Sequence, residues 1–277
     1  MTQDWNRVVD AVKTRPPNEV ARDITVLRAE SGAQWQDIEK ALAVCTQTRV
    51  LALLNDVQRA KKLMTAVRAL PLTHFAVIDL VDTEIKYLPR TLTHLSVWYY
   101  TLTASDFPSA VFESDLNLPA ILKQCPNLTH LYVKCDSHHT PLDARFTKMV
   151  NDAMATLPPS FKVFILNVSS GELWGDAETS AQNLAAIAAK DRRFVLRGNF
   201  LPFVEDQSLT GEDSGSSGED SDSDGSGIDF AMEENLEVEG LLPQELTRDD
   251  LLDWGAGWND DASLWKVAER FVESRNL

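Results

Sequence analysis

The stretch from Asn117 to Asp136, NLPAILKQCPNLTHLYVKCD, combines a short amphipathic helix, a tight turn and a strand. Its last part recurs, since Leu-Thr-His followed by an apolar residue is found at 72–75, 92–95 and 128–131. Each copy has a second apolar residue two positions further on, at Val77, Val97 and Val133. A recurring helix–turn–strand unit is typical of stacked repeats, so the pattern predicts that architecture.

Segments with helical apolar spacing alternate with short apolar runs through the first 204 residues. Helices are expected from Trp5 to the Pro16-Pro17 pair, over 34–47 and 57–70, from Pro119, over 143–157 and from about residue 176. Strands are expected to start near residues 24, 49, 72, 92, 128, 161 and 193. These spacings suit strand–helix units joined by right-handed crossovers, so we expect an α/β fold with one parallel sheet.

The turn and strand at 125–131, CPNLTHL, and the related run at 89–95, PRTLTHL, resemble the degenerate leucine-rich repeats of fungal F-box proteins. The resemblance covers about residues 20–200 and implies an irregular leucine-rich-repeat-like strand–helix solenoid. It also implies a role in holding a substrate for a ubiquitin ligase. No F-box is recognisable, because the residues before Ile24 are too few to hold one and LPQEL at 242–246 lacks a long apolar continuation.

Charge divides the chain into three parts. Residues 205–261 contain 19 acidic residues and 1 basic residue, whereas the rest of the chain contains 23 acidic and 25 basic residues. We therefore expect a leucine-rich-repeat-like domain over 1–204, a disordered acidic linker over 205–239 and a Trp-rich C-terminal segment with an amphipathic helix over 240–277. The Gly-, Ser- and acid-rich linker has too few apolar residues to offset the entropy of ordering.

Several hydroxyls of the acidic linker are followed three residues later by an acid. Ser217 precedes Asp220 in this way and Ser221 precedes Asp224, which suits phosphorylation by an acidophilic kinase. The alternative is a solubilising linker that is never modified. A third possibility is that the acidic segment binds a basic partner.

The C-terminal segment turns apolar again. Trp254, Trp258 and Trp265 lie close together, and a helical stripe is formed by Leu264, Val267, Ala268, Phe271 and Val272. One interpretation is a terminal cap that docks on the repeats, as solenoids require for solubility. The other is a partner-binding helix on a flexible tether, anchored by Trp.

Strand alternation predicts a candidate binding surface. If Leu95, Val97, Leu131 and Val133 point toward the helices, their neighbours point to the opposite face of the sheet. We expect that face to bind a protein partner through His94, Ser96, Trp98, His130, Tyr132 and Lys134. The alternative is that the C-terminal segment covers this face, so that Trp98 and Tyr132 belong to the core.

Chemical motifs are sparse. There is no Gly-rich phosphate loop, no G-x-S-x-G and no H-E-x-x-H, so we expect a non-enzymatic interaction module with no catalytic residue, no cofactor and no metal. Cys125, His130, Cys135 and His138 or His139 are permissible zinc ligands. His130, however, shares its strand position with His74 and His94, which favours a structural role. The alternative of another class is a small α/β enzyme with a site scattered in sequence.

Composition also suggests where the protein works. Three cysteines form no even disulfide framework, and the N-terminal residues lack a cationic leader with an apolar run. No stretch approaches the roughly 20 apolar residues that cross a bilayer, and no basic patch suggests nucleic acid. We expect an intracellular protein, cytoplasmic or nuclear, that binds neither membrane nor nucleic acid.

Overall fold

The structure is a computed structural model of the chain, and it describes residues 5–29, 33–54, 61–78, 80–100, 116–136, 144–169, 177–198 and 264–275. This part contains a seven-stranded sheet in which the strand order follows the chain and every pair is parallel. The strands are β1 (Val26–Ala29), β2 (Val50–Leu53), β3 (His74–Ile78), β4 (His94–Tyr100), β5 (His130–Asp136), β6 (Val163–Ser169) and β7 (Phe194–Gly198). The expected α/β fold with one parallel sheet is confirmed.

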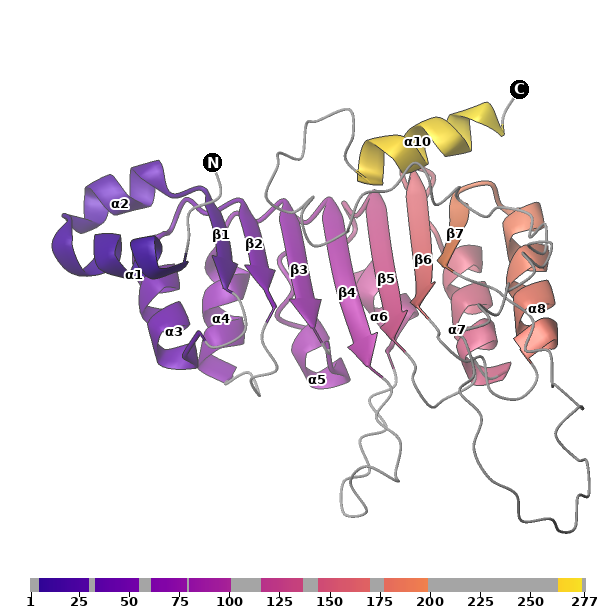
Figure 1. Cartoon of the computed structure of the whole chain (residues 1–277), viewed down its shortest axis with the longest axis horizontal. Coiled ribbons are helices and arrows are strands. Elements are labelled where there is room, and N and C mark those ends of the chain that lie inside the picture. Colours follow the sequence, from indigo (N-terminus) through magenta and orange to yellow (C-terminus); the bar gives the residue numbers. More distant parts are fainter. Residues whose placement is uncertain are drawn as a thin grey trace, which may run out of the picture.

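Helices connect the strands along one face of the sheet, and one further helix lies across the other face (Figure 1). The helices are α1 (Trp5–Thr14), α2 (Pro17–Asp23), α3 (Trp35–Val44), α4 (Lys61–Ala69), α5 (Asp82–Ile85), α6 (Leu118–Gln124), α7 (Ala144–Ala155), α8 (Ala177–Lys190) and α10 (Leu264–Ser274). None of these described helices has the length and apolar character needed to cross a membrane. The arrangement is an open row of strand–helix units with α10 on the opposite side.

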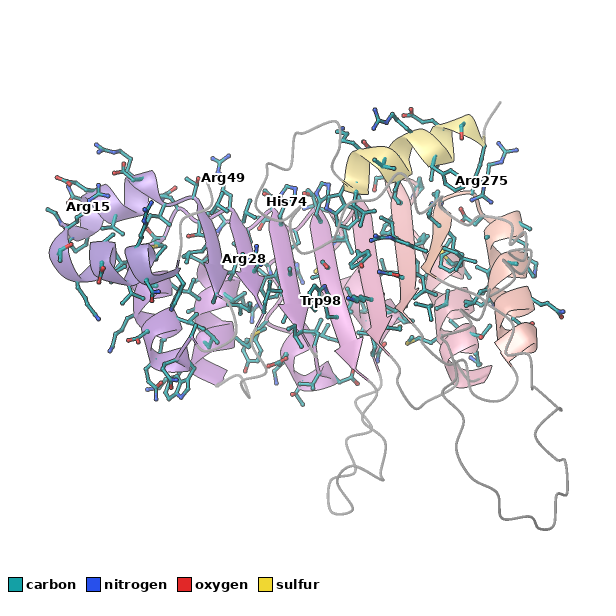
Figure 2. The ribbon with its side chains drawn as sticks, viewed as in Figure 1. Arg15, Arg28, Arg49, His74, Trp98 and Arg275 are labelled. Atoms are coloured by element: carbon teal, nitrogen blue, oxygen red, sulfur yellow. The ribbon has the colours of Figure 1, made fainter. Side chains whose placement is uncertain are left out.

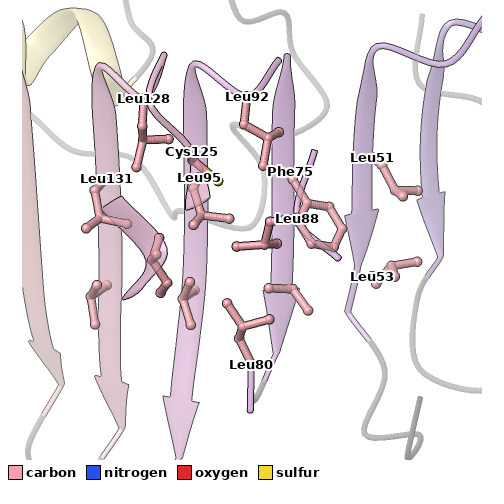
Figure 3. Packing of buried hydrophobic residues seen from close by; sticks show 14 of the residues in the cluster. Leu51, Leu53, Phe75, Leu80, Leu88, Leu92, Leu95, Cys125, Leu128 and Leu131 are labelled. Atoms are coloured by element: carbon pink, nitrogen blue, oxygen red, sulfur yellow. The ribbon is translucent and has the colours of Figure 1, made fainter. Parts of the chain in front are cut away.

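The face that carries the connecting helices is lined by large apolar side chains in register. One row crosses all seven strands with exposures of 0 to 1%: Leu27, Leu51, Phe75, Leu95, Leu131, Phe164 and Phe194. Figure 3 shows part of this packing, in which Leu92 and Leu128, at the strand entries, and Cys125 join the row. Leu95, Val97, Leu131 and Val133 point toward the helices, as the alternation predicted.

The N-terminal part differs from the expectation. Pro17 does not simply end a helix, because it also starts α2, where its missing N–H costs no hydrogen bond. Ile24, expected in the first strand, is the residue that closes α2, and β1 starts only at Val26. Between β3 and β4 the short link holds the four-residue α5, which agrees with the expectation that no full helix fits there.

The predicted domain boundaries are only partly covered by the described residues. The acidic linker over 205–239 lies outside them, and so do Ser217 and Ser221. Of the C-terminal segment over 240–277, α10 and Arg275 are described. The amphipathic helix expected there is therefore present as α10, with Leu264, Trp265, Val267 and Ala268 buried.

Candidate functional site

The face of the sheet opposite the connecting helices carries a mixed set of side chains in three register rows. We call them the start, middle and end rows, from the first to the last residues of the strands. The start row is Val26, Val50, His74, His94, His130 and Val163. The middle row is Arg28, Ala52, Ala76, Ser96, Tyr132, Ile165 and Val195. The end row is Ile78, Trp98, Lys134, Asn167 and Arg197.

The three histidines of the start row form a stacked ladder. The ring centroids of His74 and His94 are 4.1 Å apart, as are those of His94 and His130. Each Nδ1 lies 2.8 to 2.9 Å from the hydroxyl of the preceding threonine. Each hydroxyl also lies 3.0 to 3.3 Å from the carbonyl oxygen just before the previous strand, so the ladder ties one repeat to the next.

The ladder favours neutral imidazoles. Burial, and to a smaller extent the charge of His130, lower the pKa of His74 to about 4. Burial and the two neighbouring histidines lower the pKa of His94 to about 2. Burial also lowers the pKa of His130 to about 4, although Glu269 acts in the opposite direction. Stacked rings at this distance repel one another when charged, which agrees with these shifts.

Helix α10 lies on the ladder through Trp265. The indole meets His94 and His130 edge to face, with ring centroids 5.3 and 5.5 Å apart, and meets Tyr132 at 6.4 Å. Leu264, Trp265, Val267 and Ala268 join a second hydrophobic cluster with residues of β2 to β7, including Ala76, Ile165 and Val195. The amphipathic stripe read from the sequence is thus buried on this face.

A charged cluster fixes the middle of α10. Glu269 Oε1 accepts from His130 Nε2 at 3.1 Å and from Lys162 Nζ at 3.0 Å, while Oε2 accepts from Lys266 Nζ at 3.0 Å. Burial acts to raise the pKa of Glu269, but the hydrogen bonds from Lys266 and Lys162 outweigh it and lower the pKa to about 2. The Glu269 side chain is 15% exposed, so this contact is less screened than a surface pair.

The end of α10 is held by Arg275, which lies at the far end of the helix in Figure 2. Its guanidinium donates to the carbonyls of Ala188, Arg192 and Phe194 at 2.7 to 3.2 Å. Ala188 belongs to the last turn of α8, whose carbonyls lack partners within the helix. A cation at that position satisfies them and also interacts favourably with the helix dipole.

The six residues predicted to bind a partner do share one face. They form three cross-strand pairs between β4 and β5: His94 with His130, Ser96 with Tyr132 and Trp98 with Lys134. Four of them are buried, with exposures of 1 to 7%: Ser96, Trp98, His130 and Tyr132. Because Trp265 packs on His130 and Tyr132, α10 occupies part of the surface that the sequence assigns to a partner. Their role in partner binding stays a prediction.

A hollow of about 900 Å³ lies at the starts of β1 to β3, beside α10. Its wall is formed by α2 and by the entries to β1, β2 and β3: Asn18, Ala21, Arg22, Thr25, Val26, Thr46, Gln47, Arg49, Val50, Thr73 and His74. Figure 2 shows Arg49 and His74 at the starts of their strands, whereas Trp98 lies further along β4. His74 therefore belongs both to the ladder and to the hollow.

The cysteines and His130 do not form a zinc site among the described residues. Cys125 and Cys135 are buried in the core on the helix side, whereas His130 lies on the opposite face. Burial raises the pKa of Cys125 to about 12, which disfavours the thiolate that binds metal. No group of three or more metal-ligating side chains occurs in the described ranges, and His138 and His139 lie outside them.

Sequence reasoning found the histidine positions but not their contacts. The threonine before each histidine is visible in the recurring Leu-Thr-His, and that repetition was the available signal for the ladder. Nothing in the sequence indicated that Glu269 would meet His130, which is 139 residues away. Neither the family models nor the curated proteins give a match to this chain.

Proposed function

We propose that this protein is a non-enzymatic protein-interaction module that binds a partner segment along the strand starts, beside α10. The observation that carries the proposal is the continuity of the start row. Trp265 covers this row at His94 and His130, on β4 and β5. The residues of the same row on β1 to β3 line the hollow. A concave surface next to a docked amphipathic helix suits an extended or helical partner segment.

The lining of the hollow supports recognition by hydrogen bonds and charge. Arg22 and Arg49 are exposed at its wall, together with the neutral polar side chains of Asn18, Thr46 and Gln47. Arginine is a common anchor in interfaces, because its planar guanidinium donates several hydrogen bonds. The partner is therefore expected to offer carbonyls and acidic groups to this wall.

An enzymatic function is the alternative of another class. His74 is the base in the hollow, and Thr73 Oγ1 lies 2.9 Å from its Nδ1, which is within reach for a hydroxyl–imidazole pair. The same pair recurs at Thr93–His94 and Thr129–His130 with nearly equal distances. A contact that recurs at three successive strands supports a structural role at His74, and this favours the binding function.

The likeness to leucine-rich repeats of fungal F-box proteins suggests one kind of partner. Sequential parallel strands with helices on one face agree with a repeat architecture. On that basis the finer proposal is substrate recognition for a ubiquitin ligase, with His94, Ser96, Trp98, His130, Tyr132 and Lys134 as further candidate contacts.

Site-specific crosslinking tests the binding function. A photo-crosslinking residue replaces Gln47, which is exposed in the hollow, or Lys123, which is exposed on α6 as a matched control. Capture from cells of the native source should give a protein crosslinked from position 47 and absent from position 123. Ubiquitin-ligase subunits among the captured proteins would support the finer proposal.

Affinity for the captured protein then decides the role of the hollow. Arg49→Glu should weaken binding by about tenfold, because it places a like charge against an acidic partner. Lys123→Glu should leave the affinity unchanged. Equal crosslinking from both positions, or an unchanged affinity for Arg49→Glu, would contradict the proposal.

A further inference from the structure

The end row of the α10 face concentrates hydrogen-bond donors. Trp98, Lys134, Asn167 and Arg197 stand in register on the four neighbouring strands β4 to β7. Lys134 Nζ lies 4.8 Å from the centre of the Trp98 ring. Because neighbouring strands are about 4.8 Å apart, Lys134 and Arg197 start about 10 Å from each other. Two cations thus bracket Asn167 beyond the strip that α10 covers.

Two donors in this area are buried without a partner in the described part of the chain. Trp98 Nε1 and Ser96 Oγ make no hydrogen bond there, although Trp98 is only 7% exposed and Ser96 1%. Next to them the Tyr132 hydroxyl accepts from Asn167 Nδ2 at 2.8 Å. A buried indole N–H without an acceptor is costly, so an acceptor is expected to approach this end of Trp98.

An anionic acceptor fits the charges of the row. Lys134 forms no ion pair with a described carboxylate. Burial raises the pKa of Tyr132 to about 12, and the charge and hydrogen bond of Arg197 act in the opposite direction, so that cation lies beside Tyr132. Glu269, the acid of α10 on this face, is already paired with Lys162 and Lys266. Asp136, two residues beyond Lys134, is the acid nearest to it in the sequence.

The chain itself contains a candidate acceptor that is tethered close to this face. Residue 198 ends β7 directly after Arg197, and the described structure resumes at Leu264, which is buried against the same face. Between them, residues 205–261 contain 19 acidic residues and 1 basic residue. A tethered segment has an effective concentration in the millimolar range.

We propose that the acidic segment, residues 205–261, docks in cis on the end row. Its carboxylates accept from Lys134 and Arg197, and an oxygen of the segment accepts from Trp98 Nε1. This docking is independent of the hollow and of the function proposed for it.

Protection from a glutamate-specific protease tests the docking in the full-length protein. Cleavage within 205–240 of the protein is compared with cleavage of a free synthetic peptide of the same residues in the same solution. At about 0.05 M NaCl the segment of the parent protein should be cleaved at least about fivefold more slowly than the peptide, and at about 0.5 M NaCl equally fast, because salt screens the ion pairs.

Charge-neutralising variants identify the surface. Lys134→Gln with Arg197→Gln should abolish the protection, whereas Lys123→Gln with Lys190→Gln, at exposed helix positions, should retain it. Melting curves confirm that both proteins fold. If Lys134→Gln with Arg197→Gln does not fold, the salt dependence of cleavage in the parent protein still tests the docking. Equal cleavage of the parent segment and the free peptide at low salt, or protection retained in the first variant, would overturn the proposal.

A labelled glutamate-rich decapeptide distinguishes a separate partner from the tethered segment. Docking in cis predicts no measurable binding of this peptide to the parent protein, since the row is occupied. Binding to the parent and not to Lys134→Gln with Arg197→Gln would assign the row to a separate acidic partner and overturn docking in cis.

Discussion

On one face of the sheet, each strand contributes large apolar residues to a core that is closed by helices adjacent in the chain. The other face carries histidine, serine, tyrosine and lysine, and it is covered in part by α10 from the far end of the sequence. On the first face Leu95 and Leu131 are completely buried, whereas on the second His94 keeps partial exposure beside the buried His130. The comparison suggests that the first face sets the stability of the fold and that α10 docking is a separable event.

A charge on the helix side should have the largest effect. Leu131→Asp buries an unpaired carboxylate in a site with 0% exposure, and we expect a loss of several kcal/mol, close to the whole stability of a typical domain. Urea unfolding measures the loss. Ala186→Asp, at an exposed position on α8, is the matched control and should change little. An unchanged urea midpoint for Leu131→Asp would contradict the strand assignment.

Truncation on the other face should act locally. Trp265→Ala removes the contacts with His94, His130 and Tyr132, and we expect α10 docking to weaken by about 3 kcal/mol, as for a truncated buried aromatic residue. Hydrogen exchange of the α10 amides should accelerate while that of β5 amides stays slow. Glu273→Ala, on the exposed side of α10, is the control. If the sheet unfolds together with α10 in Trp265→Ala, the two faces form one cooperative unit.

Acid should release α10 before it unfolds the sheet. The pKa of His130 is about 4 when docked and about 6.5 when exposed, so undocking takes up protons and docking weakens as pH falls from 6.5 toward 4. His74 and His94 act in the same direction, whereas Glu269, with a pKa of about 2, stays ionised in this range. If undocking restored the ordinary pKa of His130 completely, the loss by pH 5 would be about 2 kcal/mol, so this value is the upper bound for His130 alone.

Hydrogen exchange of the α10 amides as a function of pH, corrected for the intrinsic exchange rate, measures this loss. His130→Asn removes the main titrating ring and should flatten the pH dependence. A docking free energy that is constant between pH 7 and pH 5 would show that the ladder does not couple to α10.

The smallest effect is expected for the charge of Glu269. Glu269→Gln retains an acceptor for His130 but removes the ion pairs with Lys162 and Lys266, and we expect a loss of about 1 kcal/mol in docking. Lys162→Gln should cost less, because Lys162 is 59% exposed and partly screened by solvent. Exchange rates of the α10 amides report both changes. A cost for Glu269→Gln equal to that of Trp265→Ala would mean that the charged cluster, not the aromatic contact, holds the helix.

The sequence predicted the repeat because its signals are local. Leu-Thr-His and the apolar residue two positions on specify which side chains of each strand point to the helices, and seven strands were expected near their observed places. The α2 helix was missed, because Pro17 was interpreted only as a helix terminator although proline is also favoured in the first turn of a helix.

For the candidate site, the sequence determined the rows and the tertiary structure decided their contacts. Alternation placed His94, Ser96 and Trp98 with His130, Tyr132 and Lys134 on one face, because successive residues of a strand point to opposite sides. It did not determine that His130 would meet Glu269 or that Trp265 would lie on the histidines. Those contacts join segments that are far apart in the chain, and only the energy of packing α10 on the assembled sheet selects them.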